Sequence, residues 1–103
     1  MNTTVMTFTV EQVCQATELP RSELLHIVEL GIVSPAGRSD ADWQFDTQML
    51  AMIRRAWRLH RQLEVDWPGI ALAMQLLQQV ETLQTENQWL RQRLQRFVHS
   101  TEQ

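Results

Sequence analysis

The sequence contains no lysine, and this absence limits the kinds of partner that the protein can bind. Its nine basic residues are all arginines, twelve residues are acidic, and the formal net charge is -3 over 103 residues. Binding to nucleic acid depends largely on basic side chains that neutralise phosphates. The composition therefore argues against a protein whose main task is to bind DNA or RNA.

Cysteine and long apolar runs are equally scarce. The lone cysteine, Cys14, can form neither an internal disulfide nor a cysteine pair for zinc, which suits a reducing compartment. No segment approaches the roughly 18 uninterrupted apolar residues that a membrane span requires. The first residues also lack the basic flank and apolar run of a secretory signal. We expect a cytoplasmic protein with no membrane segment.

Patterns that support catalysis or cofactor binding are missing as well. The three glycines of the chain form no phosphate-binding loop, and no serine lies in a nucleophile elbow. The three histidines, His26, His60 and His99, lie far apart in the sequence and form no recognisable metal-binding motif. The sequence therefore predicts a protein that is not an enzyme and that binds no cofactor or metal.

What the sequence does contain is a series of short elements followed by a long one. The alternation over Val5 to Phe8 predicts a brief strand. Thr9 and Gln12 have the spacing of a capping box, which predicts a helix over about residues 10–17. The apolar face of this helix includes Cys14, which we expect to be a core residue.

A second helix of about ten residues is predicted after the break at residues 18–20, and Gly31 ends it. Its predicted buried side chains are Leu24, Leu25 and Val28. Two short helices with a tight break between them predict a helix-turn-helix.

The segment after this motif predicts a small β wing and a third helix. Two apolar pairs, residues 32–33 and Trp43 with Phe45, flank a polar stretch rich in turn-forming residues, as in a small hairpin or wing. Asp46 is the predicted N-cap of a helix over about residues 47–63. The broad apolar face of this helix consists of Leu50, Ile53, Ala56, Trp57, Leu59 and Leu63.

The last helix is predicted to begin after Asp66 and to run for about thirty residues without a helix breaker. Its first apolar stripe, Ile70, Met74 and Leu77, suits packing on the winged core. We therefore predict a mainly α fold with two domains. Residues 1–65 form a winged helix-turn-helix with a small β wing, and residues 66–103 form a C-terminal helix for core packing and dimerisation.

A heptad pattern along this last helix predicts a coiled coil with a second helix. An asparagine at an a position, such as Asn87, lowers stability but fixes the register of the two helices. The alternative is a stripe that packs within its own domain. Glu86 can attract Arg91 across a parallel dimer or Arg93 across an antiparallel one, so both orientations stay open. The predicted dimerisation residues are Val80, Leu83, Asn87, Leu90, Leu94 and Phe97.

The charge of the helix-turn-helix argues further against DNA. Residues 21–30, which would face the major groove, carry one arginine and two glutamates. The wing adds Asp40 and Asp42 beside Arg38, so a basic partner suits this side better. Basic residues gather instead on the third helix, where the simplest interpretation is a solvated face.

Several runs of residues resemble known families. Residues 8–14 (FTVEQVC) and 31–35 (GIVSP) resemble the helix-turn-helix of MerR-type regulators. With residues 43–46, 66–71 (DWPGIA) and 86–97 (ENQWLRQRLQRF), nearly the whole chain resembles the chaperone modulatory family that acts on the curved-DNA-binding protein A, a DnaJ-like co-chaperone. The resemblance implies a homodimeric, MerR-like protein without direct DNA binding. It also implies binding to the J domain of the co-chaperone, which blocks contact with the DnaK chaperone.

An acidic surface fits this implied partner, because J domains of that kind present a basic helix to their Hsp70 partner. The resemblance does not assign the contact residues; from charge we predict Glu18, Glu23, Glu29, Asp40 and Asp42.

Two other functions stay open. One is a MerR-like DNA-binding transcriptional regulator that places Arg54, Arg55, Arg58 and Arg61 on phosphates. The other is a structural dimerisation module, which would self-associate without a specific client.

Overall fold

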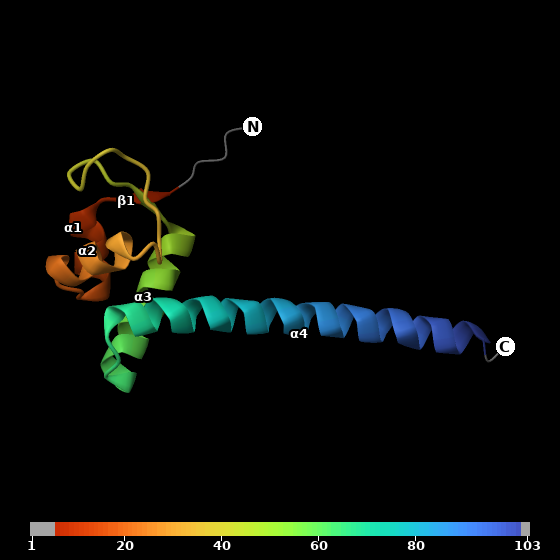
Figure 1. Cartoon of the computed structure of the whole chain (residues 1–103). Coiled ribbons are helices and arrows are strands. Elements are labelled where there is room, and N and C mark those ends of the chain that lie inside the picture. Colours follow the sequence, from red (N-terminus) through yellow and green to blue (C-terminus); the bar gives the residue numbers. More distant parts are fainter. Residues whose placement is uncertain (1–5, 102–103) are drawn as a thin grey trace, which may run out of the picture. The chain divides into compact units, whose positions relative to one another are not determined.

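The computed structural model describes residues 6–101 and is mainly helical (Figure 1). The predicted fold class is confirmed: a helix-turn-helix and a small sheet precede a long C-terminal helix. Val5, the predicted start of the first strand, lies outside the described residues. In chain order the elements are β1 (Thr7–Phe8), α1 (Val10–Thr17), α2 (Arg21–Glu29), β2 (Phe45–Asp46), α3 (Thr47–Leu63) and α4 (Trp67–Thr101).

The chain forms two compact units, and the boundary between them falls inside α4, between Leu72 and Ala73. The first unit contains β1 to α3 and the start of α4, and the second contains the rest of α4. The functional division into residues 1–65 and 66–103 stays a prediction. Within the described residues, no helix is long and apolar enough to cross a membrane.

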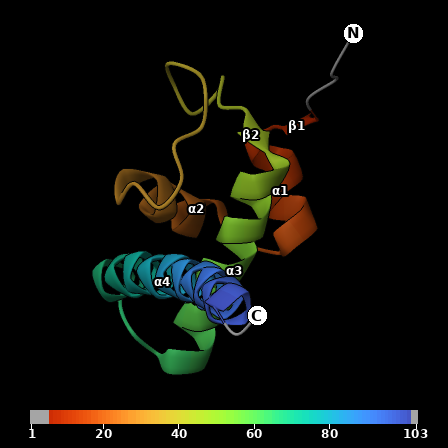
Figure 2. The same ribbon diagram turned by 90° about the vertical axis from the view of Figure 1, so that its right-hand side faces the viewer.

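The two-stranded sheet joins the two ends of the helix-turn-helix segment and is not formed within the wing itself. β1 pairs antiparallel with β2, with Thr7 opposite Asp46 and Phe8 opposite Phe45 (Figure 2). Only an isolated bridge between Ala36 and Gln44 closes the wing. A wing therefore lies where the sequence predicts one, but residues 32–33 and 43–45 do not pair with each other as two strands. Pairing with β1 keeps Phe45 fully buried, which a solvent-exposed wing could not do.

Local capping signals place the helix starts where the sequence predicts them. At α1 the Gln12 amide donates to the Thr9 hydroxyl (3.2 Å), and the Thr9 amide donates to the Gln12 side-chain oxygen (2.9 Å). At α3 the Met49 amide donates to the Asp46 carboxylate, at 2.8 Å. Each cap satisfies an amide that has no partner within its helix.

Burial differs in places from the predicted helix faces. Cys14 is half-buried rather than a core residue. On α2 the buried pair is Leu24 and Ile27, three residues apart, while Leu25 and Val28 are only half-buried. On α3, Leu63 is 55% exposed because it lies in the last turn, beyond the core. A short helix buries a narrow stripe, so apolar residues beside that stripe stay partly in contact with water.

The core of the first unit is apolar throughout, because every fully buried residue that the structure describes is hydrophobic. Apolar contacts are non-directional. The alignment of the helices around this core therefore depends on the caps and turns that connect them. Its members are Val10, Val13, Leu19, Leu24, Ile27, Val33, Phe45, Ile53, Ala56, Trp67 and Ile70.

A cluster around Trp67 fixes the joint between α3 and α4. The Trp67 ring is 7% exposed and stacks on His60, with 4.2 Å between ring centroids. The Trp67 indole N–H donates to the Glu23 carboxylate of α2. His60 Nδ1 lies 2.7 Å from the Val65 carbonyl oxygen, and because a carbonyl only accepts, that nitrogen carries the proton. The first turn of α4 is thereby attached to both α2 and α3.

Candidate partner-binding surfaces

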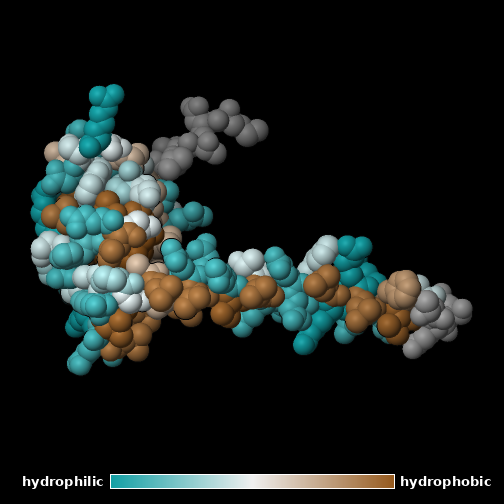
Figure 3. All heavy atoms as spheres, in the orientation of Figure 1, coloured by the Kyte–Doolittle hydropathy of each residue, from teal (hydrophilic) through white to brown (hydrophobic). Residues whose placement is uncertain are grey.

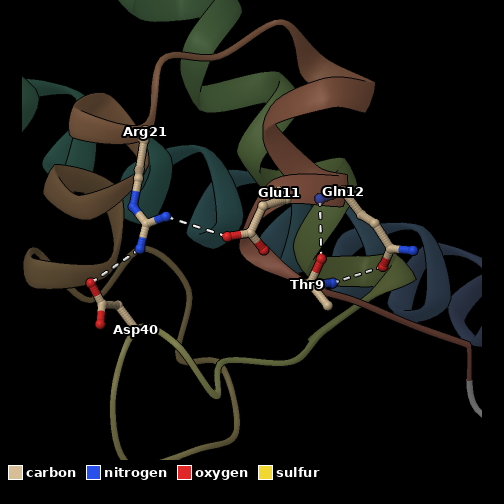
Figure 4. A network of polar contacts seen from close by, with 5 residues as sticks. All are labelled: Thr9, Glu11, Gln12, Arg21 and Asp40. Carbon is tan, nitrogen blue, oxygen red and sulfur yellow. Dashed lines mark hydrogen bonds and ion pairs between the residues drawn. The ribbon is translucent and has the colours of Figure 1, made fainter.

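Arg21 lies between two carboxylates from different elements (Figure 4). Its guanidinium contacts Glu11 of α1 and Asp40 of the wing, each at 3.3 Å. All three side chains are about half exposed or more, at 51% for Arg21, 74% for Glu11 and 48% for Asp40. Two carboxylates around one guanidinium leave a net negative charge. The single arginine of α2 is therefore already paired, and this side of the molecule stays acidic.

Glu18 and Glu29 lie at helix ends where glutamate is unfavourable. Both are exposed, Glu18 at the C-cap of α1 and Glu29 as the last residue of α2. A negative charge at a helix C-terminus opposes the helix dipole by about 0.3–1 kcal/mol. Glu18 also has a φ of 59°, a left-handed conformation that favours glycine. Glu64 at the C-cap of α3 shares this conformation, so the backbone alone does not distinguish Glu18; what Glu18 and Glu29 offer a partner is their exposed carboxylates.

The remaining predicted acidic contacts differ in their surroundings. Glu23 is half-buried and accepts the hydrogen bond from Trp67, so it acts inside the fold rather than at a free surface. Asp42 is exposed in the wing and accepts a hydrogen bond from the Ser39 hydroxyl at 3.4 Å. Of the five predicted residues, Glu18, Glu29, Asp40 and Asp42 are thus exposed on the first unit.

Cys14 lies near this charged cluster but is not activated. Partial burial raises the pKa of the Cys14 thiol above its ordinary value, Arg21 counteracts part of this rise, and Glu11 adds to it. Because the thiolate is the reactive form, the thiol stays protonated and weakly nucleophilic near neutral pH.

The predicted coiled-coil seam is an exposed apolar stripe on α4. Its apolar members are between 47% and 67% exposed, and every residue from position 78 to position 100 is exposed. Figure 3 shows apolar side chains running along one side of this helix. Within the second unit the stripe is not covered by other residues, and its role in dimerisation stays a prediction. The stripe consists of Leu76, Val80, Leu83, Leu90, Leu94 and Phe97, with Asn87 between them.

Comparison with known proteins decides the family. Residues 8–92 match the model of the MerR HTH family regulatory proteins. The chaperone modulatory protein CbpM of Pseudomonas putida strain GB-1 is 45% identical over 97 residues, which cover 94% of this chain and 96% of that protein. CbpM of Salmonella paratyphi B is 44% identical over 93 residues, covering 90% and 92%. The chain belongs to the CbpM family.

Membership in the CbpM family confirms both resemblances drawn from the sequence, the MerR-like one and the chaperone modulatory one. Residues 66–71, which carried part of that resemblance, contain both the N-cap of α4 and Trp67. The Asp66 carboxylate accepts from the Gly69 amide at 3.1 Å.

Two features of this CbpM-family chain escaped sequence reasoning because they depend on the tertiary structure, and a third because its residue type gives no signal. Glu11 joins the charged cluster although it is ten residues from Arg21. Glu23 and Trp67 are forty-four residues apart, and no local pattern connects them. The left-handed backbone at Glu18 could be inferred only from the break that follows it, since glutamate gives no signal for that conformation.

Proposed function

We propose that the chain is a non-catalytic modulator that binds the J domain of a DnaJ-like co-chaperone and competes there with the DnaK chaperone. The name shared by its relatives supports a role in a chaperone system. The observation that carries the choice of partner is the acidic side of the first unit, where the single arginine of α2 is neutralised between Glu11 and Asp40.

Charge complementarity explains how such a surface would inhibit. A basic helix on the J domain is attracted by the exposed carboxylates, which raises the rate of encounter and selects the orientation of the complex. Occupation of that helix prevents DnaK from using it at the same time. Exposed ion pairs contribute only about 0.2–1 kcal/mol each, so several carboxylates must act together.

The stripe on α4 supports a second part of the proposal, a homodimer. A seam of leucines spaced by heptads and exposed to water is stabilised when a second copy covers it. Asn87 at its centre would lower the stability of that dimer while restricting its register. Each dimer would then carry two acidic surfaces for two J domains.

Calorimetric titration with the purified J domain of the cognate co-chaperone tests this function. The double variant Glu18→Gln/Glu29→Gln removes two exposed charges, and its affinity should fall by about tenfold. The matched control Glu64→Gln/Glu81→Gln removes the same charge elsewhere and should bind like the wild type. Binding should also weaken as salt is added. A folded wild-type protein that does not bind the J domain would contradict the proposal.

A DNA-binding regulator is the second candidate, favoured by the exposure of Arg54, Arg58 and Arg61 on α3. Titration with duplex DNA separates the two functions. Salt-dependent binding that disappears in the variant Arg54→Gln/Arg58→Gln/Arg61→Gln would support DNA as the ligand. We expect no such binding, because the acidic α2 helix would repel phosphates.

A further inference from the structure

A tryptophan and an arginine form an exposed pair on α4, apart from the heptad stripe. Trp89 is 54% exposed, and the Arg93 guanidinium lies 4.8 Å from the centre of its ring. Residues four apart share a helix face, and Arg96, seven residues after Trp89, lies on the same face and is exposed. These three residues, named here the Trp89 face, combine an aromatic surface with two positive charges.

Pairing of α4 with a second copy would leave Trp89 and Arg96 uncovered, while Arg93 would lie at the edge of the seam. In the heptad that places Asn87 and Leu94 at a positions, Trp89 and Arg96 fall at c positions and Arg93 at g, outside the a and d seam. The exposure of Trp89 therefore has no explanation in dimerisation. A large aromatic side chain left in water, beside an arginine, is the composition typical of the residues that contribute most to protein interfaces.

The chain offers an internal comparison for this pair. Trp57 and Arg61 of α3 have the same spacing, with the guanidinium 5.7 Å from the ring centre. Trp57, however, is half-buried and stacks on His60 and Trp67, so it belongs to the joint between α3 and α4. Among the described residues, Trp89 has no aromatic ring beside it. Of the two pairs, only Trp89 and Arg93 leave the tryptophan ring available to a partner.

The positive charge around Trp89 indicates that the partner carries negative charge. The sequence from residue 87 to residue 101 contains three arginines and no aspartate or glutamate. Planar guanidinium groups bind carboxylates through two parallel hydrogen bonds, and the stacking of Arg93 on Trp89 restricts its orientation before a ligand arrives. We propose that the Trp89 face docks an acidic peptide segment of a protein partner. An apolar side chain of that segment packs on Trp89, and its carboxylates pair with Arg93 and Arg96.

A protein segment suits this face better than nucleic acid does. Two arginines neutralise about two phosphates, too few for strong binding because affinity for nucleic acid grows with each phosphate neutralised. The net charge of -3 also repels a polyanion of high charge density. An acidic peptide adds directional carboxylate pairs and an apolar contact to the same two charges.

An array of short synthetic peptides tests the proposal with the full-length protein. Each peptide carries one leucine or phenylalanine among glutamates at varied spacing, and a matched peptide has glutamine in place of every glutamate. The acidic peptides that bind should do so at least about tenfold more tightly than their glutamine counterparts. In heteronuclear NMR spectra, the indole resonance of Trp89, assigned from its loss in Trp89→Phe, should shift more than those of the other tryptophans.

Two variants locate the binding. Trp89→Leu and Arg93→Gln/Arg96→Gln should each weaken the selected peptide by about tenfold, while the matched control Arg54→Gln/Arg58→Gln leaves it unchanged. Circular dichroism verifies that these exposed substitutions keep the helix. The proposal is overturned if no acidic peptide exceeds its glutamine counterpart, or if the two variants bind like the wild type. It is overturned equally if duplex DNA displaces the peptide and binds more tightly through the same residues.

Discussion

Two glutamates, Glu18 and Glu64, adopt left-handed backbone conformations with φ values of 59° and 53°. Each lies at the end of a helix. In this conformation the Cβ atom of glutamate crowds the backbone, whereas glycine, which has no Cβ, adopts it without strain. The backbone amide of Glu64 donates to the His60 carbonyl at 3.2 Å, so the turn has a structural function. At Glu18 the side chain itself is what we propose the partner contacts.

Replacement of Glu18 by glycine separates stability from binding. The variant Glu18→Gly should be more stable by about 0.5–1 kcal/mol, because the strain of the left-handed residue is relieved. Its affinity for the J domain should nevertheless fall, since a carboxylate is lost. Urea denaturation and calorimetry measure the two effects.

Glu64→Gly is the matched control for this experiment, because it relieves the same kind of strain on a residue outside the proposed contact. It should gain a similar stability and bind the J domain like the wild type. Loss of J-domain affinity in this variant, or its retention in Glu18→Gly, would contradict the role assigned to Glu18.

The thiol of Cys14 provides a second test at this scale. Burial raises the pKa of this thiol, and Arg21 acts in the opposite direction. Alkylation by iodoacetamide, which consumes the thiolate, should therefore accelerate with pH and level off at a higher pH than for a free cysteine. Arg21→Gln should move the midpoint to higher pH, and Glu11→Gln should move it lower. Identical profiles for the wild type and both variants would show that the charged cluster does not act on the thiol.

At the scale of elements, the joint between α3 and α4 depends on Gly69. A Cβ atom at this position would lie 2.4 Å from a methyl carbon of Val65 and 3.1 Å from the capping oxygen of Asp66. The tight turn over residues 64–66 therefore requires glycine in the first turn of α4, although glycine is a poor helix former.

Gly69→Ala should consequently destabilise the protein by about 1–3 kcal/mol, the usual cost of overpacking, instead of adding the stability that alanine normally brings to a helix. Val65 is stiff and cannot move aside easily. The double variant Gly69→Ala/Val65→Ala should recover most of the loss. Thermal unfolding followed by circular dichroism measures both, and a stabilising Gly69→Ala would show that the turn adjusts freely.

The starts of α1, α3 and α4 could be predicted from the sequence, and for a local reason. A capping residue acts on an amide two or three positions along the chain, so Thr9, Asp46 and Asp66 each carry their own signal. Strand pairing is different, because β1 and β2 come from segments far apart in sequence. The residues around Phe45 carry no local signal for its partner, which is Phe8.

At the scale of the whole molecule, we propose that the exposed stripe of α4 governs association. Leu90→Glu places a charge in the middle of the predicted seam and should shift the protein from dimer to monomer, because burial of an unpaired carboxylate costs several kcal/mol. Sedimentation velocity over a range of concentrations measures the shift. Gln92→Glu, on the opposite side of the helix at an f position, should leave the dimer intact. A wild-type protein that is monomeric at high concentration would refute the dimer.

The sequence by itself determined the elements of this protein, their caps, the heptad stripe and the acidic sign of its helix-turn-helix. These properties are set by spacings of a few residues and by composition, which folding does not alter. Only the tertiary structure decided which acidic side chains remain available. Glu23 bonds to Trp67, Asp40 pairs with Arg21, and Glu18 stays exposed, because the availability of a charged side chain depends on neighbours that only folding brings together.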